Sequence, residues 1–339
     1  MAPPLTPRSG FLSVSSSPLA RVLGLGLALF LAGCASAPRQ SATPDPEPYM
    51  RIVRADPGKV SLQIALRRFR PVRGHGPEIW LVGASHVGES NYYATLQRYL
   101  DQRDVVLFEG VGANTKGPRF SPEEESSLQH TMAGALGLLF QLEAVDYDRA
   151  HFRNSDLTIP QLERLLAGAR HDGDGGESEA GQEFQQLLGM MNGSSTLGIL
   201  MQFGLKLIGS SPKLQAMTKL LLIEALGAFR GDMAKMKGVP PSIQKLLMVI
   251  IQERNKVVLA DLATELAARK KGSIAVFYGA GHMADLEQRL RTDLKYHPSS
   301  ETWLTAVGVD LNQAGVSDAE VDSLRSIVRW QMEALQGGP

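Results

Sequence analysis

Residues 78–110, EIWLVGASHVGESNYYATLQRYLDQRDVVLFEG, predict a strand, a glycine turn, a helix and a second strand in succession. Residues 79–82 and 105–108 are short apolar runs, which is typical of strands buried on both faces of a parallel or mixed sheet. Residues 92–100 between them have the apolar spacing of a helix. This order predicts a βαβ unit and therefore an α/β protein.

Two chemically useful side chains follow these strands. His86 ends the turn after the first strand, and Glu109 comes directly after the second. Ligands of open α/β sheets bind beyond the carboxyl ends of the strands, so we expect His86 and Glu109 on adjacent strand ends at one rim. An imidazole and a carboxylate in that position form either a metal site or an acid/base pair.

The same pattern recurs near the other end of the chain. Residues 273–278, SIAVFY, predict a strand, GAGH follows at 279–282, and residues 283–294 have helical periodicity. This G-x-x-H turn matches GASH at 83–86. Two such turns in equivalent settings predict two halves that face one site, with His282 supplied by the second half. The alternative is that both turns are architectural, with glycine making the turn and histidine capping a helix.

Four short motifs carry a resemblance to a known family. GASH at 83–86, FEG at 108–110, ERN at 253–255 and FYGAGHM at 277–283 occur in the order and spacing of the TraB/PrgY/GumN family, which includes the animal TIKI proteases. The chain resembles this family from about residue 61 to residue 308. The resemblance implies an α/β fold with a central mixed sheet built from two related βαβ-type halves, as in erythromycin-esterase (EreA) and ChaN-like proteins, and a helical cap.

The resemblance also implies a site. By motif match, His86, Glu109 and His282 hold a divalent metal, with manganese or cobalt favoured and zinc compatible with the same ligands. In the TIKI branch it implies metal-dependent proteolysis. Arg254 inherits the position of a family arginine. Many members have a glycine soon after the second histidine, where this chain has Met-Ala-Asp at 283–285.

Two further candidates come from polar segments. Residues 145–147 predict a short strand, and the segment 148–156 that follows contains His151 and Asp156. The resemblance implies an acidic residue near the site in this region, which makes Asp156 a candidate metal ligand, but a helix cap explains Asp156 equally well. Arg254 either orients a carboxylate or an anionic intermediate through a two-pronged contact or lies on the surface.

The N-terminus has the pattern of a bacterial lipoprotein signal. Arg21 precedes the apolar run 22–31, which is too short to span a bilayer, and the lipobox LAGC stands at 31–34. Cys34 is the only cysteine of the chain, so it is the predicted lipidation site. Ala35 after it resembles the outer-membrane sorting pattern. We therefore expect a protein anchored in the cell envelope, at the outer membrane and facing the periplasm in a Gram-negative host.

These patterns divide the chain into a signal peptide at 1–33, a lipidated and flexible tether at 34–50, and a single α/β domain at 51–339. The tether is rich in proline, serine and alanine. Within the domain, residues from about 157 to 251 are rich in methionine and leucine and predict a helical insertion that caps the rim of the sheet. Its apolar side chains either form ordinary core or grip a peptide or lipid.

Composition and motifs narrow the function to two hypotheses. The 35 basic and 35 acidic residues cancel, which points to neither nucleic acid nor an anionic surface as a partner. G-x-S-x-G and H-E-x-x-H signatures do not occur, which argues against a serine-hydrolase elbow and a zincin. The first hypothesis is a membrane-anchored, metal-dependent hydrolase that acts on a peptide or a small molecule. The alternative is a non-catalytic lipoprotein that sequesters a peptide or a haem-like ligand.

Overall fold

The computed structural model of the protein describes residues 46–110, 128–167, 204–228 and 241–336. The predicted signal peptide, Cys34 and most of the predicted tether lie outside these ranges. The described residues form a seven-stranded sheet in the order β1-β2-β3-β8-β5-β7, with β9 paired to β2. Its strands are β1 (Met50–Asp56), β2 (Lys59–Pro71), β3 (Glu78–Ala84), β5 (Val105–Phe108), β7 (Phe152–Asn154), β8 (Ser273–Gly279) and β9 (Tyr296–Asp310).

The sheet is mixed, and its centre is parallel. Strands β3, β8, β5 and β7 run parallel to one another, whereas β2 pairs in antiparallel fashion with β1, β3 and β9. The helices are α2 (Ser90–Leu100), α4 (Leu128–Ala135), α5 (Gln141–Ala144), α6 (Ile159–Ala167), α9 (Pro212–Ala228), α10 (Pro241–Ala268), α11 (Met283–Thr292) and α12 (Asp318–Gln336), and the short strands β4 (Val87–Gly88) and β6 (Leu139–Phe140) form a separate pair. The α/β class and the mixed central sheet predicted from the sequence are confirmed.

The order of the strands corrects one expectation. β8 lies between β3 and β5, so the strands that precede His86 and Glu109 are not adjacent. The unit β3-α2-β5 is a crossover that leaves a gap, and the later strand fills it. Local apolar patterns specify where a strand lies in the chain, but they do not specify which strand becomes its neighbour.

A second correction concerns residues 145–147, which form a turn region and no strand. The apolar side chains of Val145 and Tyr147 are nevertheless buried in the core, which explains their strand-like pattern. The strand in this region is β7, which pairs in parallel with β5 through Phe108 and Asn154. This pairing brings the residues after β7 to the same edge as Glu109.

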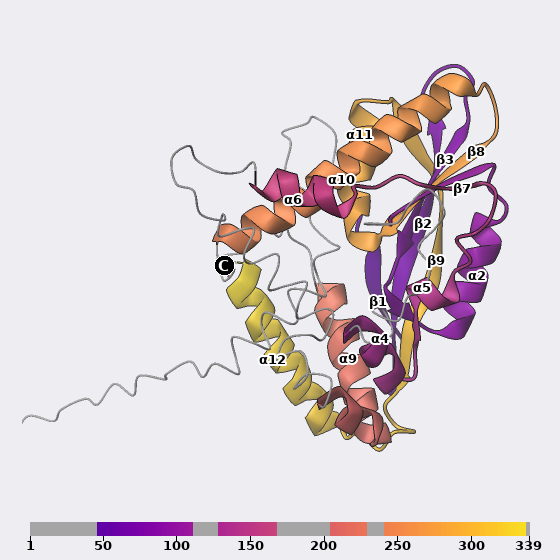
Figure 1. Ribbon diagram of the computed structural model, residues 1–339. Coiled ribbons are helices and arrows are strands. Elements are labelled where there is room, and N and C mark those ends of the chain that lie inside the picture. Colours follow the sequence, from indigo (N-terminus) through magenta and orange to yellow (C-terminus); the bar gives the residue numbers. More distant parts are fainter. Residues whose placement is uncertain (1–45, 111–127, 168–203, 229–240, 337–339) are drawn as a thin grey trace, which may run out of the picture.

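Helices cover both faces of the sheet. Val82, Ala84 and Phe108 contribute to a core that includes the buried side chains of α2 and α9, whereas the alternating residues Leu81 and Leu107 pack with α10 and α11. Figure 1 shows α10 and α11 along one side of the sheet and α2 on the opposite side. The helices that follow β3 and β8 therefore leave towards opposite faces, and the edge between these strands is a topological switch point, where ligands bind in α/β sheets.

The described part of the expected insertion is helical. α9 packs against β1, β2, β9 and α12, and its side chains Leu220 and Ile223 are completely buried in the main core. These side chains are therefore ordinary core, one of the two alternatives drawn from the sequence. α10 continues past residue 251, where the insertion was expected to end. In the described ranges, no helix has the length and hydropathy needed to cross a membrane.

Candidate functional site

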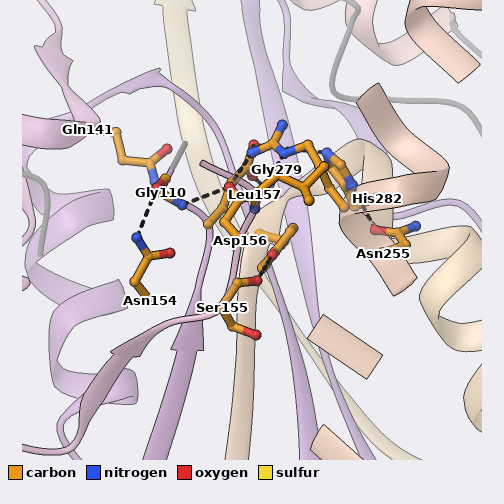
Figure 2. A network of polar contacts seen from close by, with 12 residues as sticks. Gly110, Gln141, Asn154, Ser155, Asp156, Leu157, Asn255, Gly279 and His282 are labelled. Atoms are coloured by element: carbon orange, nitrogen blue, oxygen red, sulfur yellow. Dashed lines mark hydrogen bonds and ion pairs between the residues drawn. The ribbon is translucent and has the colours of Figure 1, made fainter. Parts of the chain in front are cut away.

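The predicted site residues gather where parallel strands end. Ala84 pairs with Gly279, and Phe108 pairs with Phe277 and with Asn154, so the segments that follow β3, β8, β5 and β7 meet at one edge. These segments carry His86, His282, Glu109 and Asp156, respectively. Figure 2 shows Asp156, Gly279 and His282 close together in one polar network. The edge is also the switch point described above.

Glu109 is bound on both oxygens. Its Oε2 accepts a hydrogen bond from the backbone N–H of Gly279 at 2.6 Å, and its Oε1 accepts one from Nη2 of Arg254 at 2.7 Å. The backbone N–H of Glu109 donates to the carbonyl of Phe277 at 3.0 Å. The carboxylate is therefore tied to the end of β8, the neighbouring strand, and to α10.

Arg254 binds a second carboxylate in the two-pronged manner that the sequence suggested. Its Nε donates to Oδ1 of Asp156 at 2.8 Å, and its Nη2 donates to Oδ2 at 2.6 Å. The residue is 6% exposed, so the surface alternative for Arg254 is wrong. Arg254 lies in the middle of α10, and its guanidinium reaches the sheet edge from there.

Asp156 has a fully buried side chain that also holds the backbone around it. Its Oδ1 accepts the N–H of Leu157 at 2.7 Å, and its Oδ2 accepts the N–H of Gly110 at 2.9 Å. Leu157 precedes α6, and the residue that caps this helix is Thr158, whose hydroxyl accepts the N–H of Gln161 at 3.4 Å. The helix-cap alternative for Asp156 is therefore wrong, and its contact with Arg254 belongs to the site.

One guanidinium serves two buried carboxylates in this cluster. Burial opposes the charge of Arg254, but Glu109 and Asp156 outweigh it and raise its pKa above the ordinary value. Burial alone would raise the pKa of Glu109, yet Arg254, the two histidines and the N–H of Gly279 hold the pKa well below its usual range. Glu109 is therefore a carboxylate and Arg254 a cation at neutral pH.

His282 is buried and neutral. It lies at the end of the 3-10 turn η2 (Ala280–His282) and is 1% exposed. Burial lowers the pKa of the imidazole to about 4. Its Nδ1 lies 2.8 Å from Oδ1 of Asn255, an oxygen that can only accept, so Nδ1 carries the proton and Nε2 has a free lone pair. Among the described residues, Nε2 finds no hydrogen-bond partner, and it lies 3.9 Å from Oε1 of Glu109.

His86 lies at the same edge but is held differently. Its backbone carbonyl accepts the N–H of Gln141 at 2.8 Å, and the side chain is half-buried. Burial lowers the pKa of the imidazole, while the charge of Glu109 raises it and that of Arg254 lowers it. The charges of Glu109 and Arg254 thus both act on His86, and its lowered pKa favours the neutral form that metal ligation requires.

The fit of a metal ion can be judged from His282 and Glu109. Zinc bonds to imidazole nitrogen and carboxylate oxygen measure about 2.0–2.2 Å, so two ligand atoms of a tetrahedral site lie roughly 3.4 Å apart. The distance of 3.9 Å between Nε2 and Oε1 is longer than this, so the two side chains would have to move slightly closer together to hold an ion. The hydrogen bond from Nδ1 to Asn255 is the kind of contact that orients metal-binding histidines. The donor atoms of His282 and Glu109 are therefore of the right type for an ion, although their distance is longer than in a formed site.

The full predicted ligand set is not assembled, however. Within the part of the chain that the structure describes, no group of three or more His, Cys, Asp or Glu side chains lies close enough together to hold a metal ion. His86 therefore does not complete a set of three with His282 and Glu109 in this arrangement. Both oxygens of Glu109 are also engaged by Arg254 and Gly279.

Two further histidines, His75 and His151, lie away from the site. His75 is exposed in the loop before β3. His151 precedes β7, at the opposite edge of the sheet, where its Nε2 lies 3.3 Å from the carbonyl of Leu100.

Sequence reasoning missed the residues behind His282. Asn255 and Asp285 are buried and linked to it by hydrogen bonds. Asn255 stands next to Arg254 in the ERN motif, and Asp285 comes three residues after His282, so a helical spacing argument from the two motifs could have indicated them.

A groove lies beside the cluster, between α6 and α10. It has a volume of about 520 Å³, and it is lined by the apolar residues Leu157, Leu165, Val257 and Ala260 and by the polar or charged residues Gln161, Arg164, Glu253 and Lys256. Leu157 directly follows Asp156 in the chain. The groove is therefore next to the buried carboxylates.

Comparisons of the chain with protein-family models, with curated proteins and with solved structures gave no match. The resemblance to the TraB/PrgY/GumN family therefore stays a prediction that rests on the motif residues.

Proposed function

We propose that the chain is a membrane-anchored, metal-dependent hydrolase of the peptidase type. The observation that carries this proposal is the pair of His282 and Glu109: a neutral imidazole whose unprotonated Nε2 lies 3.9 Å from the oxygen of an ionised carboxylate. Both oxygens of Glu109 already accept hydrogen bonds, whereas the buried Nε2 of His282 has no hydrogen-bond partner among the described residues, which is costly unless something binds there. A divalent cation would satisfy Nε2 and would be attracted by the charge of Glu109.

Each side chain of the cluster has its own role in the proposed metal site. His282 supplies a neutral nitrogen and Glu109 a negative oxygen, while Arg254 keeps Glu109 ionised and compensates Asp156. His86 is the third candidate ligand, contributed from the end of β3. A divalent ion held there would bind water and lower its pKa, which is the chemistry that metallohydrolases use. The resemblance favours manganese or cobalt, and the ligand types also suit zinc.

The groove between α6 and α10 supports a substrate with an apolar side chain. It is adjacent to the cluster and partly apolar, with Arg164, Glu253 and Lys256 as its charged lining residues. A peptide or another small molecule with an apolar group can lie there with its reacting bond towards Glu109. The lipid at Cys34 would hold this site near the surface of the cell envelope, at the outer membrane facing the periplasm if the host is Gram-negative.

The test is metal content and peptidase activity of the full chain purified in detergent, with His86→Ala, His282→Ala and Glu109→Gln. We expect manganese or cobalt to bind to the wild type and to be lost in all three variants together with turnover. His151→Ala is the matched control, because this histidine lies at the opposite edge of the sheet, and it should keep both properties.

If the wild type binds no metal and the folded variants behave as the wild type does, the hydrolase proposal is contradicted. In that case the non-catalytic alternative, a lipoprotein that sequesters a peptide or a haem-like ligand, becomes the better account. Retention of ligand by Glu109→Gln would support that alternative, because sequestration does not need an ionised carboxylate.

A further inference from the structure

A chain of buried polar groups runs behind His282. Its Nδ1 meets Oδ1 of Asn255 at 2.8 Å, and Nδ2 of Asn255 donates to Oδ2 of Asp285 at 2.8 Å. Nε of Arg289 donates to the same oxygen at 2.7 Å. Asn255 is 0% exposed and Asp285 7%. This series of hydrogen bonds therefore connects the partly exposed Arg289 on α11 to the imidazole at the sheet edge. Figure 2 shows the hydrogen bond between His282 and Asn255.

The carboxylate of Asp285 fixes the donor and the acceptor of every hydrogen bond in this series. A carboxylate paired with a guanidinium offers only acceptor atoms, so Asn255 must turn its NH₂ group towards Asp285. Its carbonyl oxygen then faces His282, and the imidazole must donate from Nδ1. The choice between the two orientations of an amide is thus made by the hydrogen-bond network, which also selects the histidine tautomer.

We propose that Asn255, oriented by Asp285, is the positioning residue that keeps His282 in the Nδ1–H tautomer, with the lone pair of Nε2 turned towards Glu109. The use of that lone pair for metal binding rests on the proposed function, whereas the tautomer does not. Asn255 acts through His282 and does not touch the reacting atoms.

The position of Asn255 in α10 explains how the sequence builds this arrangement. Successive residues of a helix point about 100° apart, so Arg254 reaches Glu109 and Asp156 while Asn255 reaches His282. One turn of α10 therefore orients both partners of the His282–Glu109 pair. A lateral or rotational displacement of this turn would disturb both.

The tautomer can be measured directly. The full chain is labelled with ¹⁵N-histidine, purified in detergent without metal, and observed by NMR at pH 7, with His282→Ala to assign the signals. We expect the proton of His282 on Nδ1 in the wild type. In Asp285→Asn the replacing amide can donate as well as accept, so Asn255 can reverse, and a large share of His282 should carry its proton on Nε2. Asn255→Leu removes the acceptor and should have the same effect.

Glu287→Gln is the matched control. It removes a buried carboxylate from the same helix, but that carboxylate binds Arg67 and Arg291 and has no contact with His282. This variant should keep the tautomer of the wild type. If Asn255→Leu does not fold, Asp285→Asn, which conserves volume, decides. A proton on Nε2 in the wild type, or an unchanged tautomer in Asp285→Asn, would overturn the proposal.

The binding of Mn²⁺ or Co²⁺ separates this inference from the proposed function. If the positioning role of Asn255 and the proposed function both hold, Asp285→Asn and Asn255→Leu lower the affinity for the added ion roughly 10- to 100-fold, as expected for groups that orient a metal-binding histidine. If the wild type binds neither ion while the tautomer changes as described, the hydrolase fails and the positioning role of Asn255 stands.

Discussion

Nε2 of His282 lies 3.9 Å from Oε1 of Glu109, although the two residues are far apart in the sequence. The proximity follows from the pairing of β5 with β8, because Phe108 is in register with Phe277 and Glu109 binds the N–H of Gly279 at the end of β8. The same oxygen of Glu109 also binds Arg254. A neutral nitrogen and a cation thus meet at one carboxylate, and most predictions below test this arrangement.

Replacement of Arg254 by methionine should destabilise the fold strongly. The change leaves Glu109 and Asp156 buried beside each other without a compensating cation, and the loss of one partner of a buried ion pair costs about 3–5 kcal/mol. Urea denaturation at pH 7 measures the free energy of unfolding. Arg70→Met is the control, because the pair of Arg70 with Glu78 is partly exposed and is worth at most about 1 kcal/mol. Equal losses in the two variants would contradict a buried cluster.

The stability should fall with acid in a window set by His282. Because burial lowers its folded pKa to about 4, the unfolded state binds more protons than the folded state between that value and the ordinary one. The contribution is fully present above pH 6.5 and is lost as the pH falls towards 4, by roughly 3 kcal/mol. The lowered pKa of Glu109 adds a loss of the same sign at more acidic pH.

This pH dependence can be assigned by substitution. His282→Phe should reduce the dependence of the unfolding free energy on pH between pH 7 and pH 5, as measured by urea denaturation, and the part that remains comes from His86, whose pKa burial also lowers. His75→Ala, in an exposed loop, should leave the wild-type slope unchanged. A wild-type slope in His282→Phe would show that another group accounts for the acid sensitivity.

Filling the groove between α6 and α10 should impair substrate binding and spare the metal. Ala260→Trp places a large ring among the apolar lining residues, so we expect kcat/KM for a peptide with an apolar side chain to fall roughly tenfold or more, mainly through KM. Metal content, measured on the same preparations, should equal that of the wild type. An unchanged KM would exclude the groove as the substrate site.

The lipid anchor has its own test. Cys34→Ala removes the sulfur that a lipid would modify, so the protein should move from the membrane fraction to the soluble fraction on centrifugation of cell extracts. A serine substitution outside the lipobox, such as Ala37→Ser, serves as the control and should stay with membranes. Membrane association of Cys34→Ala would show that the lipobox interpretation is wrong.

Much of the site could be predicted from local patterns. An apolar run followed by glycine and a polar residue indicates both a strand and the end at which the side chain is delivered, which is why His86, Glu109 and His282 were expected at the carboxyl edge. The local pattern alone did not assign Arg254 to the site, because a lone arginine on a helix is ordinarily exposed; the family resemblance indicated it. Asn255 was not singled out although it belongs to the ERN motif, because its partner His282 lies 27 residues further along the chain and only the packing of α10 brings the two together.

The sequence by itself determined the α/β class, the two G-x-x-H turns at strand ends and the residues that they present, because these depend on periodicity over a few residues. Only the tertiary structure decided that β8 enters between β3 and β5, that Arg254 is buried between two carboxylates, and that Asn255 and Asp285 orient His282. Strand order and the partners of buried charges depend on contacts between distant segments, and the free energy of those contacts is set by the whole core and not by any local stretch.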